Sequence, residues 1–92
     1  MNKQELISIL KNIGSVASVS GITYSIDSVS ERYIIGTRLS THNEFKIDTD
    51  SLLRAYNDSV SGIIPMTTTA LRAYVNRVQS PTLAIIMALA KQ

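Results

Sequence analysis

An apolar run close to the C-terminus limits the fold more than any other feature of the sequence. After Thr82, residues 83–90 read Leu-Ala-Ile-Ile-Met-Ala-Leu-Ala, without one polar side chain. The preceding Ser80-Pro81 is typical of a helix cap and first turn, so we predict a helix over 81–90. A helix that is apolar on every side is stable only when every side is covered. The rest of the chain must therefore wrap around it, or a partner must cover part of it.

Length and composition indicate one small globular domain. The chain has 92 residues, of which 45% are apolar and 17% charged, a balance that excludes intrinsic disorder. It has no cysteine, which excludes disulfides, thiolate metal sites and cysteine nucleophiles. The N-terminus lacks a signal-peptide pattern, and the apolar run is far shorter than the roughly 20 residues that span a bilayer. We therefore expect a single compact α+β domain over residues 1–92, located in the cytoplasm and without a membrane partner.

The first half of the chain predicts one helix and three short strands. Asn2 and Glu5 have the spacing of a capping box, and apolar residues with helical spacing follow as far as Gly14. Residues 15–21 are small and predict a connector. Alternating apolar and polar residues then predict strands at 22–27, 33–39 and 44–48. Because short turns separate these strands, we expect an antiparallel meander.

The second half predicts three helices. Asp48 or Thr49 caps the first of them, which ends near Ser59, and Pro65 prevents a regular helix in the stretch that follows. The predicted helices cover residues 49–59, 68–78 and 81–90. The expected element order is therefore αβββααα, in which 1–48 holds the first helix and the meander and 49–92 is the helical part.

Charge is divided unevenly between the two halves. Residues 1–50 carry five cations and six acids, whereas residues 51–92 carry four cations and one acid, Asp58. A basic segment attracts polyanions such as nucleic acid. The same arginines are also typical of an ordinary solvent-exposed helix face, so charge alone leaves both interpretations open.

The predicted helix over 68–78 is the candidate binding surface. When its apolar residues Leu71, Tyr74, Val75 and Val78 turn inward, its outer side shows hydroxyl, amide and guanidinium groups and no acid. Arg pairs with phosphate or guanine, Asn with adenine, and Thr binds phosphate. The predicted nucleic-acid-binding residues are Thr68, Thr69, Arg72, Asn76 and Arg77. We expect a non-enzymatic module that binds nucleic acid through this helix.

The apolar C-terminal helix supports a rival hypothesis from another functional class. If the domain leaves part of 81–90 uncovered, that part contacts another chain, as in a homodimer, an adaptor, an inhibitor or a small subunit. The predicted interface residues are Leu83, Ile86, Met87 and Ala90. Burial of the helix between sheet and helices, with only small residues exposed, is the alternative.

One short motif resembles a catalytic metal site. Glu44-Phe45-Lys46, together with Asp27 on an earlier strand, resembles the site of restriction-type nucleases, in which the acids hold Mg²⁺ and the lysine assists the attacking water. That family has its Asp on the strand before Glu-x-Lys, whereas 33–39 contains no acid. Alternating charges on a solvent-exposed strand explain the motif without a metal. We therefore expect no enzyme activity, cofactor, metal or small-molecule substrate, and keep a degenerate nuclease fold as a remote alternative.

Overall fold

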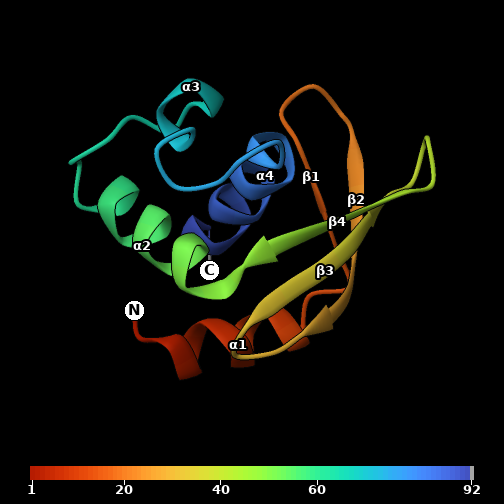
Figure 1. Cartoon of the computed structure of the whole chain (residues 1–92), viewed down its shortest axis with the longest axis horizontal. Coiled ribbons are helices and arrows are strands. Elements are labelled where there is room, and N and C mark those ends of the chain that lie inside the picture. The colour runs from red at the N-terminus through yellow and green to blue at the C-terminus, as the bar shows by residue number, and fades with distance from the viewer. Residues whose placement is uncertain (92) are drawn as a thin grey trace.

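The computed structural model describes residues 1–91, and within this range it contains four helices and one four-stranded antiparallel sheet (Figure 1). The elements are α1 (Lys3–Lys11), β1 (Ser15–Ala17), β2 (Thr23–Val29), β3 (Tyr33–Arg38), β4 (Asn43–Asp48), α2 (Thr49–Val60), α3 (Thr68–Leu71) and α4 (Gln79–Ala90). The strands follow chain order across the sheet, so the connections form a meander. The predicted α+β class is confirmed.

Helix α4 is the centre of the core. It contacts β1, α2 and α3, and its residues Ile85 and Ile86 have no accessible surface. Residues from every other layer meet it in one cluster, including Leu10 of α1, Ile34 of β3 and Leu52 of α2. The chain thus covers most of this helix by itself. No helix within residues 1–91 combines the length and the apolar character that crossing a membrane requires.

The sheet buries one face and leaves the other open. Tyr24, Ile34, Phe45 and Ile47 point into the core, as the alternation in β2 and β4 predicts. In β3 the buried set contains Ile34 and Gly36. The opposite face carries mainly polar and charged residues and is exposed in its outer strands. Since all four helices pack on the buried side, the open face contributes no core.

Strand β1 lies within residues 15–21, for which the sequence predicts a connector, so that prediction is wrong. Its middle residue Val16 is buried and lies opposite Tyr24 of β2. Hydrogen bonds from the Ile26 amide to the Gly14 carbonyl and from the Ser18 amide to the Ile22 carbonyl extend the pairing at both ends. Three small residues are too few to show the alternation of a strand, so only pairing with β2 reveals it.

The predicted helix over 68–78 is also wrong in extent, since α3 ends at Leu71. The chain continues through turns in which Tyr74 and Val75 both donate backbone hydrogen bonds to the Leu71 carbonyl. Arg77 has φ 66°, which a right-handed helix does not allow. The predicted inward residues still point inward, Leu71 and Val75 being buried and Tyr74 half-buried. Helix α4 then begins at Gln79, two residues before the predicted start.

Gly36 is required where β3 crosses under an aromatic ring. It is buried opposite Phe45 in the β3–β4 register, and a Cβ atom there would collide with the Ser25 carbonyl oxygen and the Phe45 ring. The same ring packs edge-to-face on Tyr24, with ring centroids 5.7 Å apart. The ring and the neighbouring strand backbone therefore leave no room for a side chain.

We predict that Gly36→Ala lowers the free energy of unfolding by about 3 kcal/mol, because strand or ring must shift to admit the methyl group. Urea denaturation measures this change. Gly14→Ala is the matched control, since a Cβ atom at Gly14 meets nothing within 4 Å. Equal stability of the two variants would contradict the packing described for Gly36.

Candidate nucleic-acid interface

Three of the five predicted nucleic-acid-binding residues come together at the start of α4. Thr68 and Thr69 of α3 and Arg72 after it line a shallow polar hollow of about 210 Å³ with Gln79 and Ser80. All three predicted residues are exposed. They meet there because α3 folds back against the first turn of α4, and not because they share one long helix.

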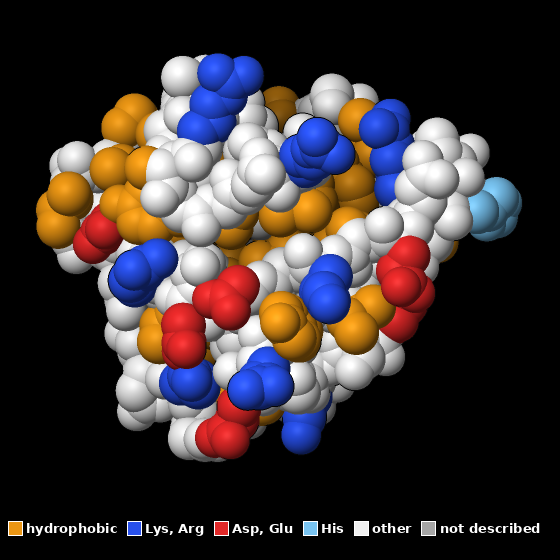
Figure 2. Space-filling view, viewed as in Figure 1, with side chains coloured by type: hydrophobic (Ala, Val, Ile, Leu, Met, Phe, Trp, Pro, Cys, Tyr) orange, Lys and Arg blue, Asp and Glu red, His pale blue; other side chains and the backbone are white. Residues whose placement is uncertain are grey.

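Arg77 lies at a second, neighbouring hollow, which we call the edge groove. The groove has a volume of about 430 Å³ and runs between β4 and the connection from α3 to α4. Ser80 lines both hollows, so they adjoin at the start of α4. Asn76 is exposed but lines neither of them. Figure 2 shows Lys and Arg side chains around a depression with apolar side chains at its floor.

The structure adds two cations to the predicted nucleic-acid-binding residues. Arg38 at the end of β3 and Lys46 of β4 line the edge groove together with Arg77. Both belong to the half of the chain with more acids than cations, so a count along the sequence points away from them. With Arg72 and Arg77 they form what we call the basic surface.

The cations of the basic surface are not neutralised by ion pairs. Among residues 1–91, the one salt bridge joins Lys3 to Asp50, on another part of the molecule. Arg38 donates to the Ser40 hydroxyl at 3.3 Å, and the Lys46 ammonium lies 4.3 Å from the centroid of the Tyr33 ring. These contacts leave the positive charges intact.

The start of α4 increases the positive potential of the basic surface, and few acids lie beside it. Helix α4 has no acidic residue in its first turn, and its N-cap Val78 provides no side-chain hydrogen bond, so the positive end of the helix dipole stays uncompensated. Nearby, Asp58 accepts a hydrogen bond from the Tyr74 hydroxyl, and this bond raises the pKa of Tyr74. Glu44 is the one acid that lines the edge groove.

The backbone of Arg77 is in a strained conformation. Its φ of 66° lies in the left-handed region, which residues other than Gly, Asn and Asp rarely adopt. Such a conformation costs on the order of 1 kcal/mol and persists only where the surroundings impose it. Here the buried residues Val75 and Pro81 fix the chain on both sides of Arg77.

We predict that Arg77→Gly raises the free energy of unfolding by about 1 kcal/mol, because glycine adopts this φ without steric cost. Arg77→Asn is the companion variant, since Asn tolerates the left-handed region and also lacks the positive charge. Urea denaturation of the three proteins tests this. A loss of stability in Arg77→Gly would show that the arginine side chain, and not the backbone, decides stability at this position.

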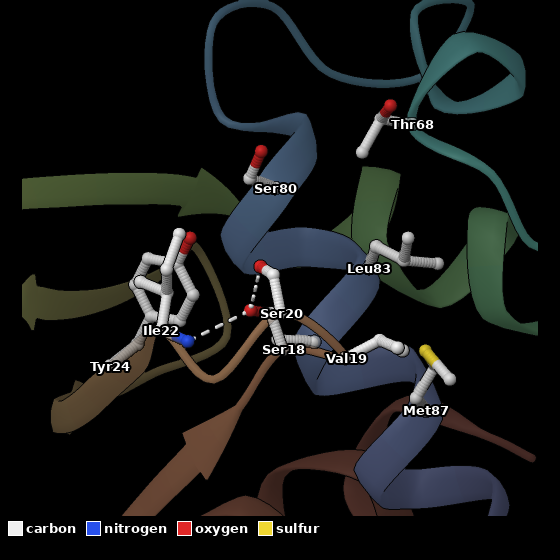
Figure 3. Close-up of a pocket in the computed structure, with 10 residues that line it drawn as sticks. Ser18, Val19, Ser20, Ile22, Tyr24, Thr68, Ser80, Leu83 and Met87 are labelled. Carbon is white, nitrogen blue, oxygen red and sulfur yellow. Dashed lines mark hydrogen bonds between the residues drawn. The ribbon is translucent and has the colours of Figure 1, made fainter.

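The predicted partner interface is only partly at the surface. Leu83 and Met87 are half-buried and line an apolar pocket of about 300 Å³ between α4 and the β1–β2 loop (Figure 3). Val19 of that loop also lines the pocket and is 83% exposed. Ile86 has no accessible surface, so its expected place at the interface is wrong, and Ala90 is exposed outside the pocket. Ile86 is buried because sheet and helices enclose that side of α4.

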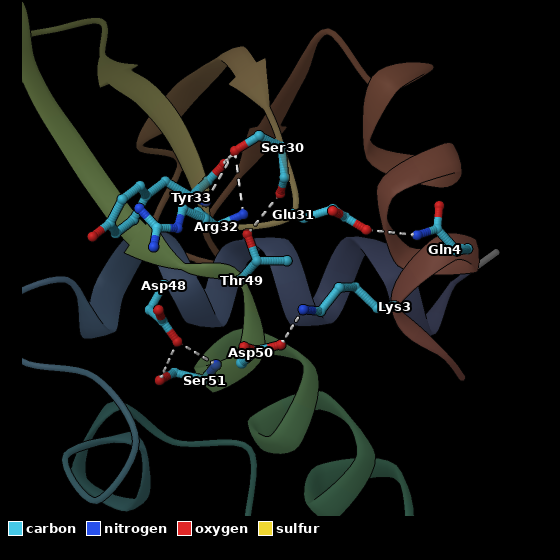
Figure 4. Close-up of polar contacts among 10 residues, drawn as sticks. All are labelled: Lys3, Gln4, Ser30, Glu31, Arg32, Tyr33, Asp48, Thr49, Asp50 and Ser51. Carbon is cyan, nitrogen blue, oxygen red and sulfur yellow. Dashed lines mark hydrogen bonds and ion pairs between the residues drawn. The ribbon is translucent and has the colours of Figure 1, made fainter.

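The acidic residues at the other end of the molecule have structural partners (Figure 4). The predicted cap Asp48 is confirmed, since its carboxylate accepts from the Ser51 amide and hydroxyl, both at 2.9 Å. Asp50 pairs with Lys3 at 2.6 Å, which raises the pKa of the lysine. Thr49 donates to the Ser30 carbonyl at 2.9 Å. These contacts join α1, the β2–β3 turn and the start of α2.

The residues of the nuclease-like motif lie apart on the open face of the sheet. Asp27 is in a bulge of β2 and accepts hydrogen bonds from Thr37 at 2.7 Å and Ser25 at 2.8 Å, which lower its pKa. Glu44 is on β4 opposite Thr37, with β3 between the two acids. The backbones of the two acids are two strand spacings apart, roughly 10 Å, and the Asp27 carboxylate is already bonded to two hydroxyls. The described residues hold no cluster of three or more metal-binding side chains.

Comparisons with known proteins add no relative. No family model, no curated protein and no solved structure matches the chain. The proposals below therefore depend on the geometry and charge of the chain itself.

Proposed function

We propose that this protein binds nucleic acid through the basic surface, with Thr68, Thr69 and Asn76 as additional hydrogen-bonding residues. The observation that carries the proposal is the meeting of cations from three separate segments around two adjoining hollows. Arg38, Arg72 and Arg77 have no carboxylate within 4 Å in the described part of the chain. Arginines left without acidic partners are typical of surfaces that contact phosphate.

The charge distribution also supports one orientation of the ligand. The open sheet face carries Asp27, Glu44 and Asp48. Lys46 at its edge is the one cation of the basic surface beside them, so the balance of this face is acidic and repels phosphate. The side of the molecule around α3 and the start of α4 has the opposite balance. A nucleic acid would therefore lie over α3 and the α3–α4 connection, where hydroxyl and guanidinium groups face its backbone.

We predict that the affinity for a labelled DNA duplex or RNA oligonucleotide falls steeply with salt, because binding releases counterions from the phosphates. Removal of one phosphate-binding cation should reduce the slope of log K against log salt by about one. Fluorescence anisotropy at several salt concentrations, with Arg72→Ala and Arg77→Asn, measures both effects.

Lys11→Ala is the matched control, because it removes one exposed cation from α1, away from the basic surface. Its slope should stay close to that of the unchanged protein. If all three variants keep the original slope, or if no oligonucleotide binds at low salt, the proposed function is wrong.

A second candidate function is self-association at the apolar pocket of α4. The observation that favours it is the exposure of Val19, the most exposed large apolar side chain among the described residues, beside a pocket lined by Leu83 and Met87. A two-fold contact places Val19 of each copy in the pocket of the other, which covers both apolar surfaces at once.

If this contact forms, sedimentation at increasing protein concentration shows a dimer that Val19→Asp abolishes, because a carboxylate is costly to bury in an apolar pocket. Ile63→Asp is the control, since Ile63 is 70% exposed and does not line the pocket. A monomer at all concentrations, or equal loss of dimer in both variants, contradicts self-association at this site.

A further inference from the structure

The sheet has two edge strands, β1 and β4, and the six-residue β4 is the longer of the two. Strand β4 is the last strand in the order β1-β2-β3-β4, so only one of its sides faces another strand. Among the described residues, no other backbone segment forms hydrogen bonds with the amides of Glu44 and Lys46. Unpaired edges of this kind are the places where a further strand adds to a sheet.

The register of the sheet identifies which residues of β4 face outward. The Thr49 amide donates to the Arg32 carbonyl at 2.9 Å, and pairing alternates with a period of two from there along β3 and β4. Phe45 and Ile47 therefore use their backbone groups to bond to β3. The N–H and C=O groups of Glu44 and Lys46 point to the free side.

The edge groove follows this free side. One wall of the groove is residues 43–46 of β4, with Arg38 of β3 and Tyr24 of β2 beside them. The other wall is Arg77 and Val78 of the α3–α4 connection with Ser80 and Pro81 of α4. Its floor includes the Phe45 ring, and apolar side chains are visible there in Figure 2. The groove thus combines a row of unpaired backbone groups, an apolar floor and cationic walls.

We propose that the edge groove binds an extended acidic peptide segment of a partner protein, which adds to β4 as a fifth strand. Its backbone pairs with the outward N–H and C=O groups of Glu44 and Lys46. Every second side chain points into the groove, where apolar residues meet Phe45, Val78 and Pro81 and an acidic residue meets Arg38 and Arg77. This inference does not depend on the proposed function, although Arg38, Lys46 and Arg77 belong to both surfaces.

The charged side chains of the edge groove favour an acidic peptide. Arg38 and Arg77 line the groove against one acid, Glu44, while the Lys46 ammonium lies over the Tyr33 ring. An extended segment with inward acids is therefore attracted, and one with inward lysines is repelled. The backbone of the peptide also supplies the alternating donors and acceptors that the strand edge requires, which a nucleic acid does not. Arg77 faces the groove in spite of its strained backbone, which is consistent with a role in binding.

A blocked hexapeptide, acetyl-Thr-Val-Thr-Asp-Thr-Val-amide, is the probe, because it places Val, Asp and Val on one side of an extended strand. NMR titration of the full chain with this peptide should shift the amide signals of Glu44 and Lys46, and hydrogen exchange at these two amides should slow at saturation. Replacement of the peptide's Asp by Lys should weaken binding about tenfold or more, since two arginines face that position.

The variant pair Lys46→Pro and Lys46→Ala isolates the backbone contribution. Both variants lack the lysine charge, but only proline removes the outward N–H, and proline is tolerated on the free side of an edge strand. Peptide binding should be about tenfold weaker in Lys46→Pro than in Lys46→Ala, whereas nucleic-acid binding should be equal in the two. Circular dichroism checks that both variants fold.

Equal peptide affinity in the two variants, or binding without slower exchange at Glu44 and Lys46, overturns the proposal. If Lys46→Pro does not fold, the exchange measurement on the unchanged protein decides. Concentration-dependent protection of the same amides without peptide would assign the edge to a second copy of the chain. Protection by an oligonucleotide but not by the peptide would assign the groove to nucleic acid, and either result also overturns the proposal.

Discussion

The burial of α4 is the interaction on which the rest of the structure depends. Ile85, Ile86 and Leu89 are almost completely removed from water, and each such side chain contributes about 1.5–3 kcal/mol relative to an exposed one. A domain of this size has few other sources of stability, since it has no cysteine to form disulfides. Strand β1, α2 and α3 contact the helix directly, and α1 and the other strands contribute side chains to the same core cluster.

The same packing produces the basic surface. Leu71 and Val75 anchor the α3–α4 connection in the core, and the Tyr74 hydroxyl ties it to Asp58 of α2. A chain held at these points has to turn sharply before α4 begins, and Arg77 adopts its left-handed backbone in that turn. The turn directs a polar segment toward the hairpin end of β3 and β4, where Arg38 and Lys46 are located. Arg38, Lys46 and Arg77 are far apart in sequence. They come together because the segments that carry them pack around the apolar helix α4.

The two faces of the sheet divide the molecule into regions of different chemistry. The open face carries acids that engage neighbouring hydroxyls, as Asp27 does with Ser25 and Thr37, and the helical side carries the arginines. The free edge of β4 lies at the boundary between them, with backbone groups unpaired and cations nearby. The basic surface and the groove along this free edge share three cations, Arg38, Lys46 and Arg77. None of the three lines the apolar pocket beside Val19.

The sequence by itself determined the elements whose signals are local. The Asn2–Glu5 capping box, the Asp48 cap, the alternation in β2 and β4 and the apolar run of α4 all depend on residues within a few positions of one another. Only the tertiary structure decided the rest. Strand β1 exists through pairing with β2, α3 ends early because the core holds Leu71 and Val75, and Ile86 is buried by elements distant in sequence. Arg38 and Lys46 lie near Arg77 because the strands pack beside the α3–α4 connection. The spacing of residues along the chain does not show which of them packing brings together.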